Sequence, residues 1–176
     1  MESYIQWVTD HPLFSAAIQF GFLGTFGEIL SVSVRRNRFA ISGTLWQTGA
    51  KVLAWALLGI VIKYGFAGMK GFTKGLIDHD LLPQSCADGM GWALTVSVLT
   101  NLFFGPQMMF FHRLEDNLIA WRWNMEGLTT AWWTLVWFLI PAHTITFSLP
   151  TEYQIGLAAV WSVVLGFILG IVKKTR

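Results

Sequence analysis

Long apolar stretches are the feature of this sequence that most restricts how the chain can fold. Four windows of about 20 residues or more contain no charged side chain or, in the first of them, only Glu28. A fifth window, 39–66, is interrupted only by Lys51 and Lys63, whose long side chains are expected to reach the two interfaces. Because about 20 apolar residues span a bilayer as a helix, this pattern predicts five transmembrane helices, at 12–34, 43–66, 89–112, 128–149 and 153–173.

The composition agrees with a membrane protein and excludes several other classes. Apolar residues make up 54% of the 176 residues and charged residues 12%, against about 25% in soluble domains. The sequence therefore predicts a single all-α transmembrane helical bundle over residues 1–176. The single cysteine, Cys86, excludes an intrachain disulfide framework, and a net charge of +2 gives no indication of nucleic-acid binding. Since the sequence has no cofactor motif, we expect the lipid bilayer as a partner and neither a cofactor nor a metal ion.

Basic residues are distributed unevenly over the expected loops. With five spans, the loops on one side of the membrane contain most of them: Arg35, Arg36, Arg38, Arg113, Arg122, Lys173, Lys174 and Arg176. The loops on the other side contain only Lys70 and Lys74, together with several acidic residues. Because basic loops tend to remain in the cytoplasm, this asymmetry predicts an outer N-terminus and a cytoplasmic C-terminus.

Turn-forming and polar residues predict where the helices begin and end. Asp10 stands two positions before Pro12, so Asp10 is expected to cap the first span. Glycines, charges and a proline predict an outer loop over 67–88, with a short surface helix at 72–77. The polar stretch 112–127 is expected to form the second long linker.

Polar side chains inside the apolar windows are the first candidates for function. A carboxylate inside a membrane is costly, so we expect Glu28 to face the bundle interior or a wet cavity. The leading interpretation is that Glu28, Asn101, Gln107 and His143 line a pore. The alternative for Glu28 is a hydrogen bond to a neighbouring helix, or a place near the cytoplasmic end of its own helix.

Prolines and glycines inside the windows predict local helix geometry. Pro106 and Pro141 are expected to kink their helices, because proline lacks the backbone N–H that a carbonyl one turn earlier needs. Small residues at helical spacing favour close helix packing, and they occur at Gly21, Gly24, Gly27, Gly166 and Gly170.

A second polar group lies at the end of the third window and consists of His112, Arg113, Glu115 and Asp116. Spacings of three and four residues place His112 on one helix face with Glu115 and Asp116. A metal site or an acid/base site is one interpretation of this group. A charge cluster that anchors the helix end at the interface is the favoured one, since no third ligand from another segment is evident.

Three blocks of the sequence resemble the Mpv-type membrane proteins of peroxisomes and mitochondria. The first block, YIQWVTDHPLFSAAIQFGFLGTFGEILS, has the aromatic, proline and glycine positions of that family at Tyr4, Pro12, Gly21, Gly27 and Glu28. The second block, FFGPQMMFFHRLED, matches at Gly105, Pro106, Phe111 and Asp116. The closing block, FSLPTEYQIGLAAVWSVVLGFILG, matches at Phe147, Pro150, Tyr153 and Trp161. The sequence departs from the family in having Glu28 where Asp is usual and Gln154 where a basic residue is usual.

The resemblance implies a small integral membrane protein, and some members of that family are described as weakly selective pores. On that reading Glu28 is a pore-lining carboxylate. The leading functional hypothesis is therefore a channel or transporter-like passage for small hydrophilic solutes or ions, with a homo-oligomer as a further expectation. Two alternatives stay open: a membrane scaffold that binds partners through 67–88 and 112–127, and an intramembrane enzyme that uses the polar group at 112–116.

Overall fold

The computed structural model describes residues 2–41 and 43–174, with side chains as far as Ile171 in the last helix. Helices make up 86% of it, and no strand occurs in the described part, so the fold is an all-α bundle. In chain order the elements are α1 (Glu2–Asp10), α2 (Pro12–Arg36), α3 (Leu45–Asp78), η1 (Gln84–Cys86), α4 (Gly89–Leu99), η2 (Thr100–Phe104), α5 (Gly105–Ala120), α6 (Leu128–Thr134), η3 (Leu135–Leu139), α7 (Ile140–Ser148) and α8 (Thr151–Lys174). The segment η1 is a 3-10 turn, whereas η2 and η3 are π-helical turns within longer helices.

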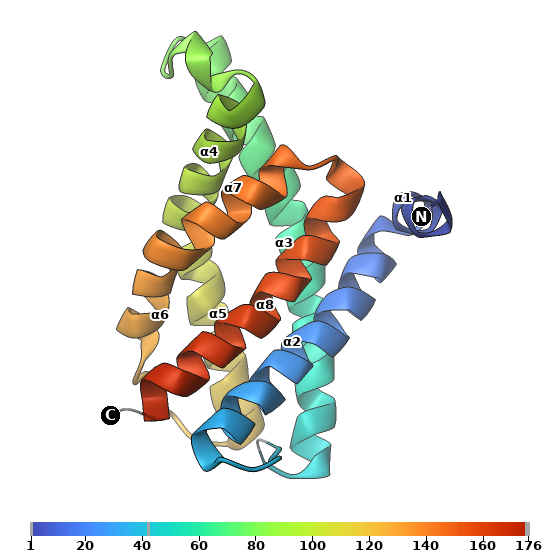
Figure 1. Ribbon diagram of the computed structural model, residues 1–176, viewed down its shortest axis with the longest axis vertical. Coiled ribbons are helices and arrows are strands. Elements are labelled where there is room, and N and C mark those ends of the chain that lie inside the picture. Colours follow the sequence, from blue (N-terminus) through green and yellow to red (C-terminus); the bar gives the residue numbers. More distant parts are fainter. Residues whose placement is uncertain (1, 42, 175–176) are drawn as a thin grey trace.

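The chain runs back and forth along the long axis of the molecule (Figure 1). Helix α2 packs against both α3 and α8, and α4 packs against α7. The short helix α1 lies across the beginning of α2. The connections α2–α3 and α5–α6 and the end of α8 lie together at one end of the bundle, whereas the turn between α3 and α4 projects at the opposite end (Figure 1). The basic loops expected on one side of the membrane are therefore grouped in space.

Four helical stretches are long and apolar enough to cross a membrane: Pro12–Arg36, Leu45–Asp78, Gly89–Ala120 and Thr151–Ile171. These stretches fit an integral membrane protein, and they correspond to the first, second, third and fifth expected spans. The fourth expected span, 128–149, is helical from Leu128 to Ser148 but does not reach the same combination of length and apolarity. Its threonines and tryptophans lower its mean hydropathy, and its second half packs along α4.

The prediction of an outer loop over 67–88 is wrong for residues 67–78, because α3 continues without a break to Asp78. The proposed short helix at 72–77 is the last part of α3. The helix persists because Phe66, Thr73 and Ile77 stay buried at helical spacing, although glycines lie between them. In the last turn, Lys74 Nζ lies 2.7 Å from the Asp78 carboxylate, an (i, i+4) ion pair that supports the helix end.

Two further boundaries differ from the sequence-based expectation. Asp10 does not cap the first span, since it ends α1 and His11 holds the cap position of α2 without a side-chain hydrogen bond. Tyr4 anchors this unexpected helix by donating to Gln19 Oε1 over 3.0 Å, and burial of its hydroxyl raises the pKa of Tyr4. The polar stretch 112–127 is helical as far as Ala120, because several of its polar side chains have partners on the neighbouring helix α3, as Asp116 has in Lys51.

The two prolines expected to bend their helices each follow a π-helical turn. Pro106 lies two residues after the end of η2, and Pro141 lies two residues after the end of η3. A π turn is the usual local response where the regular ladder of backbone hydrogen bonds is interrupted. The hydroxyl of Ser97 donates to the backbone oxygen of Ile140 over 2.7 Å and joins the two interrupted helices.

Glycines allow α2 and α8 to approach each other closely. A Cβ atom added at Gly166 would lie 2.3 Å from the backbone oxygen of Gly27, and one at Gly170 would lie 2.9 Å from that of Ser31. Gly21 packs against α3 in the same way, with Val52 O at 3.2 Å from an added Cβ. The interpretation of these glycines as helix-packing residues is confirmed, and the Gly166–Gly170 pair packs within the chain.

Candidate functional site

A cavity of about 610 Å³ lies inside the bundle, between α2, α3, α5, α8 and the helical stretch from Leu128 to Ser148. One end of the cavity reaches the outside. Arg35, Gly43, Arg122 and Asn124 line it there, and all four are exposed. Arg35 lies in the last turn of α2, and the other three belong to the connections α2–α3 and α5–α6, so the mouth of the cavity lies at the end of the bundle where those connections meet (Figure 1).

The opposite end of the cavity is closed by packed apolar side chains. Phe20, Phe66 and Ala158 line the cavity and also belong to the largest buried cluster of the protein. We call this cluster the apolar barrier; its members, none more than 5% exposed, are Ala16, Phe20, Phe66, Ala93, Val96, Phe147, Ile155, Ala158 and Ala159. Along α2, α7 and α8 these residues continue away from the mouth, so the cavity ends blindly at the barrier.

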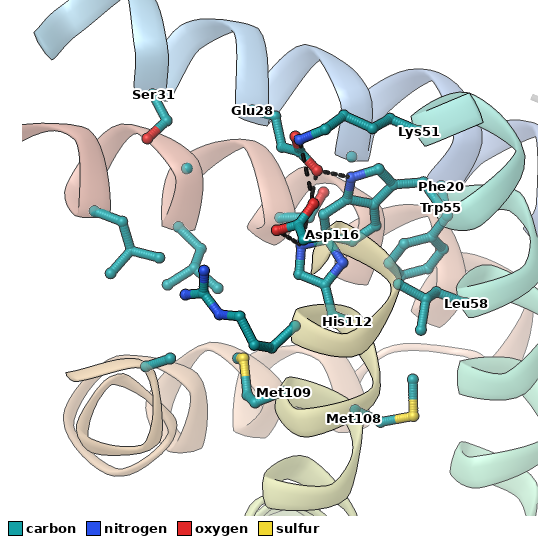
Figure 2. Close-up of a pocket in the computed structure, with 18 of the residues that line it drawn as sticks. Phe20, Glu28, Ser31, Lys51, Trp55, Leu58, Met108, Met109, His112 and Asp116 are labelled. Carbon is teal, nitrogen blue, oxygen red and sulfur yellow. Dashed lines mark hydrogen bonds and ion pairs between the residues drawn. The ribbon is translucent and has the colours of Figure 1, made fainter. Parts of the chain in front are cut away.

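Glu28 lies on the cavity wall and is fully engaged by helix α3. The indole Nε1 of Trp55 donates to Glu28 Oε1 over 2.8 Å, and Lys51 Nζ forms an ion pair with Glu28 Oε2 (Figure 2). Lys51 and Trp55 are four residues apart on α3 and therefore share one face. Gly24, one turn before Glu28, makes room for the indole, since a Cβ added there would lie 2.2 Å from the Trp55 ring.

Helix α5 completes this charged group. Asp116 Oδ1 lies 3.2 Å from Lys51 Nζ, and His112 Nε2 lies 3.7 Å from Glu28 Oε1 and 3.9 Å from Asp116 Oδ2. The His112 ring also packs on the Trp55 indole, with 4.5 Å between ring centroids. We call Glu28, Lys51, Trp55, His112 and Asp116 the polar cluster; its side chains converge from three helices (Figure 2).

The charges of the polar cluster are paired with one another, with one negative charge in excess when His112 is neutral. Lys51 bridges the two carboxylates, and the side chains of Lys51, Glu28 and Asp116 are only 12%, 17% and 28% exposed. One ligand atom from each of Glu28, His112 and Asp116 could approach a metal ion, because these atoms lie within 4.8 Å of one another. The ammonium group of Lys51 already lies between the two carboxylates, so the geometry favours an ion-pair network over a cation site.

A second polar contact lies deeper, next to the apolar barrier. Asn101 Nδ2 donates to the backbone oxygen of Ser97 over 2.8 Å and to His143 Nδ1 over 3.1 Å. Both Asn101 and His143 line the cavity, and the His143 ring packs edge-on against Phe66 of the barrier. Because Nδ1 accepts this hydrogen bond, Nε2 carries the proton of the neutral ring.

The structure brings most of the candidate residues together around one cavity. Glu28, Asn101 and His143 line it, and so do His112, Arg113 and Asp116 of the second candidate group. Two candidates do not line it. Gln107 is exposed on the outer face of α5 and donates to Phe103 O of its own helix. Glu115 lies beside His112, with Oε2 at 3.9 Å from Nδ1, but outside the cavity lining.

Sequence reasoning missed the roles of Lys51 and Trp55. Lys51 was expected to reach the interface, yet its side chain points into the bundle and binds Glu28 and Asp116. The signal that could have revealed this pair is electrostatic. An acid in one apolar window and a base in the next are each costly alone, and much less so as partners.

Comparisons with family models, curated proteins and solved structures find no match to this chain.

Proposed function

We propose that this integral membrane protein forms a passage for small hydrophilic solutes or ions. The observation that carries the proposal is the cavity of about 610 Å³, which has an open mouth at one end and charged side chains on its wall about one to two helical turns in from that end. Charged side chains at membrane depth are expensive unless they face partners or water. A cavity with a polar wall and an exposed mouth provides that water.

The apolar barrier is then the closed gate of the passage. Solute entering at the mouth passes the polar cluster, reaches Asn101 and His143, and stops at Phe20 and Phe66. Opening requires small shifts of α2, α7 and α8 that separate the barrier side chains, a motion of packed helices known from other switching proteins. The resemblance to Mpv-type proteins, some of which are described as weakly selective pores, points in the same direction. The tendency of basic loops to remain in the cytoplasm supports a cytoplasmic mouth for this passage.

Uptake into vesicles tests the proposal. Purified protein is reconstituted in phosphatidylcholine vesicles, and entry of radiolabelled sorbitol, a neutral six-carbon solute, is compared with entry into protein-free vesicles. The passage predicts uptake above the protein-free rate. Glu28→Gln, which removes one of the two carboxylates of the cavity wall, is expected to shift the ratio of Na⁺ to Cl⁻ permeability toward Cl⁻. Glu2→Gln, on the exposed first turn of α1, is the matched control. Folded protein that admits neither sorbitol nor small ions above the protein-free rate contradicts the proposal.

A membrane scaffold is the second candidate, and one observation favours it. The turn between α3 and α4 projects beyond the other helices (Figure 1) and exposes the apolar side chains of Leu81 and Met90, which are 69% and 65% exposed. Under this alternative, Leu81→Ser with Met90→Ser abolishes partner binding, and substitutions in the cavity change only stability. Flux that depends on cavity residues decides against it.

A further inference from the structure

Three arginines line the mouth half of the cavity, and none of them has an ion-pair or hydrogen-bond partner among the described side chains. Arg35 lies in the last turn of α2, Arg113 lies on α5, and Arg122 follows α5. Within the described part of the chain, no carboxylate lies in ion-pair distance of these guanidinium groups, and no hydrogen bond from them is found. Guanidinium groups with five unused donors are costly to bring together unless an anion or water satisfies them.

The acidic residues of the cavity cannot supply that anion. Among the described lining residues, Glu28 and Asp116 are the only acids, and both bind Lys51. Glu28 also accepts from Trp55, so its two oxygens are in use. The lining has four basic residues against these two acids, which leaves a surplus of two positive charges on the wall when the histidines are neutral. That surplus lies on the three arginines.

These three arginines differ in position from the other basic residues at this end of the protein. Arg36 and Arg38 lie in the same region and do not line the cavity. Retention of basic loops in the cytoplasm requires only charge near the span ends, and Arg36 and Arg38 meet that requirement equally well. Three arginines on the lining of one cavity are instead typical of recognition of carboxylate or phosphate oxygens, which fit the planar donor pair of arginine.

We propose that the solute of this passage is a small organic oxyanion, a carboxylate or a phosphate ester, drawn into the mouth by Arg35, Arg113 and Arg122. This inference rests on the proposed function and names its substrate class. A cleft with one sign of charge and apolar walls concentrates counter-ions at its entrance. The wall beyond the arginines includes the apolar side chains of Met108, Met109 and Leu165, which suit the carbon skeleton of such a solute.

A charge series of similar solutes tests the inference. Gluconate, sorbitol and N-methylglucamine share a linear six-carbon chain with several hydroxyl groups and differ mainly in charge. Their uptake is measured in phosphatidylcholine vesicles with the membrane potential held at zero by K⁺ and valinomycin. Gluconate is expected to enter about fivefold faster than sorbitol, and N-methylglucamine more slowly than sorbitol. The triple variant R35Q/R113Q/R122Q is expected to lose the preference. R36Q/R38Q, which removes the same kind of charge outside the cavity, is expected to keep it.

The outcomes separate the two proposals. If all three solutes enter at the protein-free rate, the passage itself is contradicted. If sorbitol enters and gluconate is no faster, or if the triple variant keeps the preference, the passage stands and the oxyanion inference is overturned. Should the triple variant fail to fold, the three single variants replace it, and each is expected to reduce the preference in part.

One further arm distinguishes a dissolved anion from a lipid headgroup. The ratio of gluconate uptake to sorbitol uptake is measured again in vesicles that contain phosphatidylglycerol. The unmodified protein and the triple variant are compared in the same vesicles. A dissolved substrate predicts that the preference over the variant persists. If the anionic lipid abolishes it, the arginines bind a headgroup and the inference is overturned.

Discussion

The indole N–H of Trp55 donates to Oε1 of Glu28 over 2.8 Å, and it holds the only acidic residue of the first span in one orientation. Lys51, one turn earlier on α3, takes the other oxygen of the same carboxylate and also reaches Asp116 on α5. The contact therefore does more than satisfy a costly group. It joins α2, α3 and α5 around the cavity wall and gives the cavity a fixed charge pattern.

The bridge by Lys51 predicts unequal effects of removing its members. Lys51→Met leaves two carboxylates uncompensated and is expected to lower the free energy of unfolding by about 3 kcal/mol. Glu28→Gln leaves Lys51 paired with Asp116, so about 1–2 kcal/mol is expected. The double variant should cost less than the sum of the two. Unfolding in mild detergent, followed by circular dichroism, measures all three; strictly additive effects would show that the two side chains do not interact.

The close approach of α2 and α8 predicts a strong effect of small substitutions. Gly166→Ala forces a Cβ atom to within 2.3 Å of the Gly27 backbone oxygen, so the helices must separate, with an expected cost of about 1–3 kcal/mol. Gly49→Ala is the control, because no atom lies within 4 Å of a Cβ added there. Thermal melting in detergent compares the two. Equal melting temperatures would contradict the packing described for these helices.

Asn101 and Gln107 provide a matched pair of polar residues on either side of Pro106. Asn101→Ala removes the hydrogen bonds to Ser97 and His143, so a loss of about 1 kcal/mol and altered uptake are expected. Gln107→Ala removes only a hydrogen bond to its own helix on the exposed face. The free energy of unfolding should therefore stay within about 0.5 kcal/mol of that of the unmodified protein, and uptake should be unchanged within measurement error. A larger effect at Gln107 than at Asn101 would reverse the assignment of cavity and outer faces.

The sequence predicted the membrane class and most of the helices because both depend on local apolarity and length. The centres of the spans at Pro12–Arg36 and Thr151–Ile171 follow from that signal alone. Helix ends were predicted less well. Glycines near 68–75 indicated a loop, but the buried face that includes Thr73 and Ile77 keeps α3 helical, and burial is a tertiary effect that a glycine pattern does not reveal.

The candidate site was predicted in part, for a related reason. Glu28, Asn101 and His143 were identified from the free-energy cost of placing a polar side chain inside the bilayer, without any knowledge of their neighbours. Gln107 satisfied the same criterion, yet it lies on the exposed face of α5, just after a π turn that changes which residues share a helix face. The convergence of Lys51 with Asp116 depends on how α3 and α5 pack, and neither spacing nor composition contains that information.

Blocking the cavity tests the passage most directly. Met109 lines the cavity from α5 (Figure 2), whereas its neighbour Phe110 is 42% exposed on the outer face of the same helix. Met109→Trp fills part of the cavity and Phe110→Trp does not, so sorbitol uptake into vesicles is measured for both variants and for the unmodified protein. We expect Met109→Trp to reduce uptake about tenfold or more and Phe110→Trp to leave it unchanged. Equal uptake by the two folded variants, or no uptake by the unmodified protein, would contradict a passage through this cavity.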